Sequence, residues 1–115
     1  MIDLTFLQKF SKGNTDKMKR YISMYLSGTP EIIANMAQNV KEQDWEHLRI
    51  NAHSLKPQAE FMGDAALHSA LIEIETAVKD KRIDSLEALF LKAKQLYEAS
   101  ESMLNNHLET LTQLS

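Results

Sequence analysis

The sequence predicts an all-α protein, an antiparallel up-down four-helix bundle with an additional short N-terminal helix. Three observations predict this fold class. Only three glycines and two prolines interrupt the 115 residues, and apolar residues recur at steps of three and four along most of the chain. The connections between the long periodic segments are short, which favours antiparallel neighbours. Because no linker or change in composition divides them, residues 1–115 are expected to form a single domain.

The first two helices are predicted from their boundary residues. Asp3 can cap a short N-terminal helix, and Gly13 can end that helix in the left-handed conformation. Asn14 or Thr15 then caps the second helix. This second segment is interrupted at Gly28-Thr29-Pro30-Glu31, where a threonine cap and a proline at the first helical position fit a restart or a kink. We therefore expect one bent helix or two collinear ones.

The remaining helices carry similar boundary signals. Asp44 can cap the third helix, Gly63 closes it, and Asp64 can cap the fourth. The last helix is expected to begin near Asp84 or Ser85. Its apolar stripe is longer than those of its neighbours, so we expect its end to project beyond them.

Composition and charge narrow the function classes. The net charge of −3 gives no basic footprint for nucleic acid, and the absence of cysteine excludes disulfides and thiolate metal sites. No apolar run approaches the ~18 residues that span a bilayer, and no secretory signal opens the chain. We therefore expect a cytoplasmic protein that binds neither nucleic acid nor a membrane.

The third helix presents a histidine on its solvent side. Its predicted core positions recur at steps of three and four: Trp45, Leu48, Ala52, Leu55, Ala59 and Met62. At about 100° per residue, His53 lies roughly 130° from the centre of this stripe and should face solvent. Arg49 and Lys56 flank it on the same surface.

An exposed imidazole between two cations suits chemistry on an anion. An unperturbed histidine has a pKa near 6.5, so a large neutral fraction is available as a nucleophile at neutral pH. The residues alone leave an equal alternative, in which His53 is a surface histidine without a chemical role.

The segment Ala52-His53-Ser54-Leu55-Lys56, followed by Met62-Gly63, resembles the signature of histidine-containing phosphotransfer (HPt) domains, roughly A-H-x-L-K-G-x-x-x-x-L-G. The resemblance implies a helical bundle in which His53 is the phosphoryl acceptor and Lys56 the positive neighbour of the phosphate. It implies receiver (response regulator) domains as partners, including those of a hybrid histidine kinase. The aspartate and Mg²⁺ are then expected on the partner, and no cofactor on this chain.

Two residues depart from the family pattern. Pro57 stands where the family most often has glycine, and Glu60 where it usually has a small residue. Proline lacks an N–H and its ring crowds the carbonyl four residues back, which belongs to His53. We expect a local kink or widened turn here without loss of the helix.

A partly apolar line runs along the face of this helix that contains His53. It consists of Ile50, His53, Pro57 and Phe61. Either another helix covers Ile50 or Phe61, or the line is a docking surface. The predicted partner-binding residues are Arg49, Ile50, Pro57, Glu60 and Phe61.

The predicted function is therefore a monomeric intermediate of a multistep two-component phosphorelay. With no glycine-rich nucleotide loop, neither kinase nor ATPase activity of its own is expected. The alternative is a non-catalytic adaptor, a pseudo-HPt that binds a partner through the Ile50/Pro57/Phe61 face. A bundle metalloprotein is disfavoured because the chain has no pair of Glu-x-x-His motifs. In some members of the family a polar residue orients the imidazole. Glu73 or Glu75 is a candidate for this role, although solvated helix surface is the favoured interpretation of both.

Overall fold

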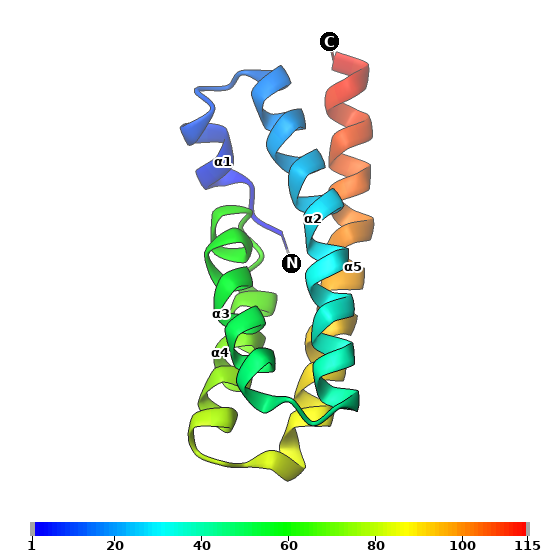
Figure 1. The fold of residues 1–115 in the computed structure, drawn as a ribbon. Coiled ribbons are helices and arrows are strands. Elements are labelled where there is room, and N and C mark those ends of the chain that lie inside the picture. Colours follow the sequence, from blue (N-terminus) through cyan, green and yellow to red (C-terminus); the bar gives the residue numbers. More distant parts are fainter. Residues whose placement is uncertain (1, 115) are drawn as a thin grey trace.

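The computed structural model describes residues 2–114 of the chain, with side chains for residues 2–113. Helices joined by short turns make up nearly all of it, which confirms the all-α prediction (Figure 1). The elements are α1 (Thr5–Phe10), α2 (Thr15–Lys41), α3 (Trp45–Phe61), α4 (Ala65–Lys79), the short 3-10 helix η1 (Ile83–Ser85) and α5 (Leu86–Leu114).

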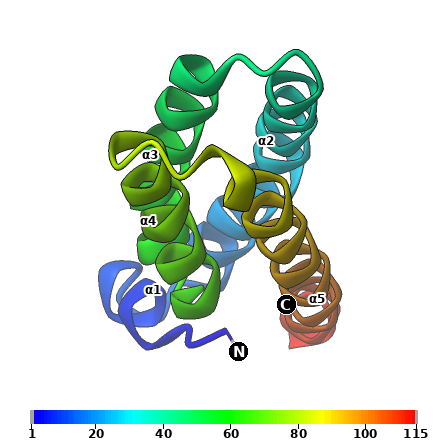
Figure 2. The ribbon, with the colours of Figure 1, turned by 90° about the horizontal axis from the view of Figure 1, so that it is seen from below.

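The four long helices form a closed ring of neighbours. The α3 helix packs against α2 and α4, and α5 packs against the same two helices. In Figure 1 the chain descends along α2, rises along α3, descends along α4 and rises along α5. Figure 2 shows the bundle end-on, with α3 and α4 together on one side and α2 and α5 on the other. The result is a rod of 48 × 20 × 19 Å.

The core is built from the inward stripe of each long helix. Its largest fully buried apolar side chains on these helices are Ile22, Met36, Leu48, Leu55, Leu67, Leu71, Ile74, Leu86 and Leu104. Burying such stripes supplies most of the stability of helices in a bundle, because isolated helices are marginal in water. The outward faces are then free to carry polar groups without weakening the fold.

The α2 helix continues without a break through the predicted interruption. Tyr25, Thr29, Ile33 and Met36 all lie on its buried face at helical spacing. Of the two expected arrangements, one helix is present and not two, and Thr29 is not a cap. Continuous core burial holds this stretch helical despite the backbone hydrogen bond that Pro30 lacks. Two of the predicted caps are confirmed: the side chain of Asn14 accepts from the Lys17 N–H, and that of Asp44 accepts from the His47 N–H.

Asp64 stands at the cap position of α4, but its side chain does not cap that helix. The carboxylate is fully buried and accepts hydrogen bonds from Tyr25 Oη of α2 at 2.9 Å and Ser100 Oγ of α5 at 2.8 Å. Burial raises the pKa of Asp64, and the two hydroxyl groups only partly oppose this. The predicted cap is instead a polar link among three helices.

The turn between α3 and α4 also holds the N-terminal segment. The Asp3 N–H donates to the Gly63 carbonyl at 2.9 Å, and Ile2 forms an isolated β-bridge with Asp64. Gly63 has a φ of +71°, and a Cβ added there would overlap the Asp3 carbonyl oxygen. Glycine is thus favoured at this position by backbone conformation and required by the close approach of a second segment.

A series of glycine variants separates these two requirements. Gly28→Ala in the open interior of α2 should stabilise the protein by about 0.5–1 kcal/mol. Gly13→Ala, at φ +72° with nothing within 4 Å of the added Cβ, should cost about 1–2 kcal/mol from the left-handed backbone alone. Gly63→Ala should cost more than Gly13→Ala in urea unfolding, because it must also displace Asp3. Equal costs at the two positions would contradict the close contact between Asp3 and Gly63.

The stability of the fold should depend on the ionisation of Asp64. Because burial raises its pKa above the value of about 3.9 for an unfolded chain, its contribution to stability is fully present below that value and is lost as pH rises through the folded pKa. Asp64→Asn should remove this loss. Urea unfolding from about pH 4 to 7 should therefore show the wild type losing stability relative to the variant. Parallel pH profiles would show that Asp64 does not titrate in this way.

Candidate functional site

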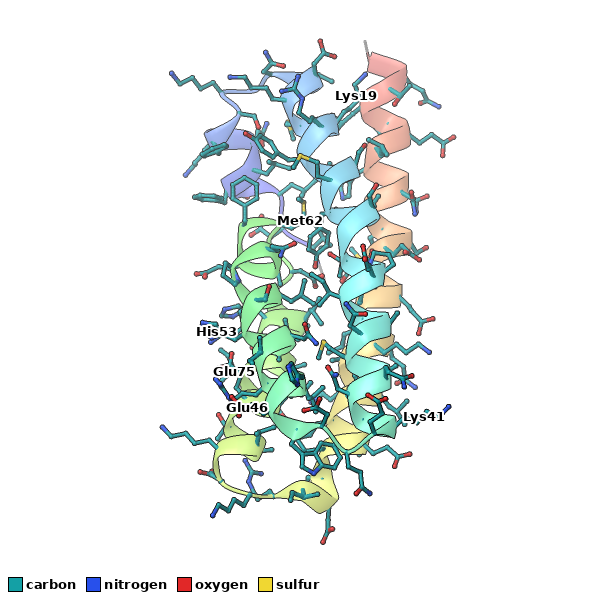
Figure 3. All side chains as sticks on the ribbon, in the orientation of Figure 1. Lys19, Lys41, Glu46, His53, Met62 and Glu75 are labelled. Carbon is teal, nitrogen blue, oxygen red and sulfur yellow. The ribbon has the colours of Figure 1, made fainter. Side chains whose placement is uncertain are left out.

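His53 projects from the outer face of α3. Its side chain is 67% exposed, whereas Ala52 and Leu55 on either side of it in the helix are fully buried. Figure 3 shows His53 and Glu75 together on the outer edge of the bundle, on the side of α3 and α4 away from α5. The periodic core stripe thus orients the imidazole toward solvent, as the sequence predicted.

A single carboxylate from the neighbouring helix contacts both polar residues of the signature. Glu75 Oε2 of α4 lies 3.3 Å from His53 Nδ1, and Glu75 Oε1 lies 2.8 Å from Lys56 Nζ. Its side chain is only 19% exposed. Burial alone would raise the pKa of Glu75, but hydrogen bonding and positive charge from Lys56 and His53 outweigh it and lower the pKa. The carboxylate is therefore held ionised between the two residues.

The contact with Glu75 determines which nitrogen of His53 is available. An ionised carboxylate only accepts hydrogen bonds, so a hydrogen bond at this position requires the proton on Nδ1. In neutral imidazole the other nitrogen then carries the lone pair. Within residues 2–113, no polar contact to Nε2 is found. The geometry therefore leaves Nε2, on the exposed side of the ring, as the nitrogen whose lone pair is not engaged within the protein.

The two candidate glutamates of α4 have different neighbours. Glu73 is exposed and pairs with Lys92 of α5 at 3.5 Å. The interpretation of both as solvated helix surface therefore holds for Glu73 and is wrong for Glu75. Both flank the buried stripe of α4, on opposite sides of it. The sequence pattern marks these two flanks but does not show which of them faces α3.

The predicted partner-binding residues lie in different environments. Arg49 is engaged on its own helix, with Nη2 2.5 Å from Glu46 Oε1. Ile50 is 45% exposed, so no other helix covers it. The carboxylate of Glu60 lies 3.8 Å from His68 Nε2 of α4.

The other two predicted residues continue the same face toward the end of α3. Pro57 is exposed, and α3 stays α-helical across it without the expected widened turn. Phe61 is half-buried, with its ring 5.4 Å from that of Phe6 and 5.2 Å from that of Phe10. The N-terminal helix therefore covers Phe61, one of the two alternatives that the sequence left open.

The family is shown by comparison with known proteins. A family model described as the Hpt domain matches residues 20–113, which include His53, Lys56 and Glu75. The chain belongs to the HPt family. No curated protein and no solved structure shows significant similarity to this HPt chain. Its α1 helix lies outside the matched residues.

In the part of the chain that the structure describes, no group of three or more histidine, aspartate or glutamate side chains is arranged to hold a metal ion. Over the same residues, no helix is both long enough and apolar enough to cross a bilayer.

Removing Glu75 should change the tautomer of His53 in this HPt chain. In the wild type, ¹⁵N NMR at a pH where the ring is neutral should show the proton on Nδ1, whereas Glu75→Ala should shift the population toward the Nε2–H form. Glu73→Ala, on the opposite flank of α4, is the matched control and should leave the tautomer unchanged. Identical tautomer populations in wild type and Glu75→Ala would contradict the assignment.

Proposed function

We propose that this HPt chain is a phosphorelay intermediate that accepts a phosphoryl group on His53 from a receiver aspartate and passes it to another receiver. Membership of the HPt family implies a part in a His–Asp phosphorelay. The observation that carries the residue assignment is the exposed imidazole of His53, with Nδ1 against Glu75 and Nε2 directed outward.

The transfer step needs little covalent machinery on this chain. The lone pair of Nε2 attacks the phosphorus, the Nε2–P bond forms, and the P–O bond to the receiver aspartate breaks. The electron pair of that bond leaves with the aspartate as a free carboxylate. The Nδ1 proton stays on the ring, and the reverse sequence hands the phosphoryl group to a second receiver. Such reactions depend mainly on positioning and on electrostatic stabilisation.

Two charged neighbours match the charges that develop during transfer. The imidazole becomes positive as Nε2 donates its lone pair, and the ionised carboxylate of Glu75 lies against the opposite nitrogen. Lys56, one helical turn from His53, supplies positive charge for the phosphoryl oxygens. Glu75 therefore acts as a positioning residue for the imidazole and as an anchor for the ammonium group.

The remaining parts of the reaction belong to the partner. The receiver supplies the aspartate and Mg²⁺, and this chain carries no cofactor, no kinase activity and no ATPase activity of its own. We propose that it works as a cytoplasmic monomer. The adaptor alternative is not favoured, because membership of the HPt family and the outward Nε2 both support phosphoryl exchange.

A phosphotransfer assay on matched variants tests this function. After incubation with a phosphorylated receiver, acid-labile phosphate should be found on the wild type and on His47→Gln, an exposed histidine of the same helix, but not on His53→Gln. Lys56→Ala should slow transfer by about tenfold, less than for a buried electrostatic group because the lysine is partly solvated. Lys92→Ala is its control, because Lys92 lies on α5 and pairs with Glu73 instead of Glu75. Label on His53→Gln would refute the acceptor, and a receiver that binds stably without labelling the wild type would support the adaptor.

A further inference from the structure

A cleft lies between α2 and α5, and the residues that line it come from these two helices. Its volume is about 430 Å³. Figure 2 shows α2 and α5 together on one side of the bundle, whereas His53 projects from the side formed by α3 and α4 (Figure 3). Ligand sites in proteins are commonly clefts of about 300–1,000 Å³. The α2/α5 cleft is therefore large enough for a small molecule, and it is separate from the phosphoryl acceptor.

The α2 wall of this cleft is apolar. It is formed by Pro30, Ile33, Ala34 and Ala37. The two alanines are exposed, and their short side chains leave space between the helices. An apolar group that packs against this wall is removed from water together with the wall, which favours binding.

The α5 wall supplies polar groups that lack partners. Glu101 is half-buried and Glu98 is exposed. Among residues 2–113, no basic group lies within ion-pair distance of either carboxylate. Both glutamates are therefore free to accept hydrogen bonds from a cation that enters the cleft.

Tyr97 contributes a second kind of unpaired group to the same wall. Its side chain is only 3% exposed, and its hydroxyl forms no hydrogen bond of accepted geometry within residues 2–113. Burial raises the pKa of Tyr97, and the negative charge of Glu101 raises it further. The hydroxyl stays protonated and its oxygen can still accept. Because an unsatisfied buried polar group costs free energy, a donor at this position is favoured.

Charge is distributed unevenly along the cleft. Lys94 lies at one end of the α5 wall and Glu101 at the other, about 10 Å apart along the helix. Glu98 lies between them, so the end that contains Tyr97 and Glu101 is negative. The lining residues of each helix span only about two turns, a length that fits a small molecule better than a helix of a partner protein.

We propose that the α2/α5 cleft binds a small organic amine in its protonated form, with a compact apolar body. The ammonium group donates to the Glu101 carboxylate and to the Tyr97 hydroxyl oxygen, and the body packs against Ile33 and the two alanines of α2. A neutral or anionic molecule of the same shape leaves the carboxylates unpaired and is disfavoured. The proposal does not depend on phosphoryl transfer at His53, and either can fail without the other.

The test uses 2-phenylethylamine as the probe, because it joins a protonated amine to one aromatic ring. 2-Phenylethanol and 3-phenylpropionate have similar bodies with a neutral and a negative end. Each is titrated into the ¹⁵N-labelled chain and followed by two-dimensional NMR. The amine should bind with a Kd of about 1 mM and shift the amide signals of residues 33–37 and 97–101. The alcohol and the acid should bind about tenfold more weakly or not at all.

Two variants with matched controls locate the site. Glu101→Gln should weaken binding of the amine about tenfold, whereas Lys94→Gln should leave it within about twofold or tighten it. Ala34→Leu should fill the cleft and abolish binding, whereas Ala99→Leu, at an exposed position of α5 outside the cleft, should not. Leucine is a good helix former, so both leucine variants should fold like the wild type.

Three results would overturn the proposal. Equal binding of 2-phenylethylamine and 2-phenylethanol would refute the class of ligand. Unmoved amide signals along the cleft, or undiminished binding by Ala34→Leu, would refute the site. A wild-type dimer in sedimentation that Ala34→Leu dissociates would assign the cleft to a second copy of the chain instead of a small amine.

Discussion

The packing register of α3 against α4 is the constraint on which the site depends. Glu75 reaches His53 because the short turn at Gly63 fixes how far each residue lies from the point where the chain reverses. The same offset recurs two helical turns closer to the turn, where Glu60 of α3 lies opposite His68 of α4. A change in register by one residue would rotate Glu75 by about 100° on its helix and remove the contact with the imidazole.

Features far from His53 maintain this register. Gly63 lets the chain reverse within a few residues and lets the N-terminal segment pack against the turn. Asp64, the next residue, bonds to α2 and α5 at the start of α4. A buried carboxylate with two specific hydroxyl partners opposes sliding of the helices, since any shift would leave it unpaired. Burial of Asp64 disfavours its ionised form. The same buried position lets its hydrogen bonds fix the register of the helices.

Much of this arrangement could be predicted from the sequence, and the failures have physical causes. The exposure of His53 followed from the spacing of Leu48, Leu55 and Ala59, because a helical period fixes directions within one helix. Contacts between helices could not be predicted, because the helical period does not show which neighbouring helix lies on each flank. The contact of Glu75 with His53 was missed for this reason. The sequence left open whether Thr29 interrupts the second helix, because local capping preference favours a break there, whereas the burial that continues on both sides of it favours a single helix.

Before any phosphate arrives, the positive charge of Lys56 is already balanced by the carboxylate of Glu75. In the proposed relay, this pairing favours release of the phosphoryl group to a second receiver as well as its acceptance from the first. Stabilising a phosphoryl group on His53 therefore requires the ammonium group to divide its interaction between the carboxylate and the new dianion. That competition weakens the hold on the phosphate, while Glu75 keeps its contact with Nδ1 and supports the positive ring. A carrier that bound the phosphoryl group with an unpaired lysine would hold it more tightly and return it to a receiver more slowly.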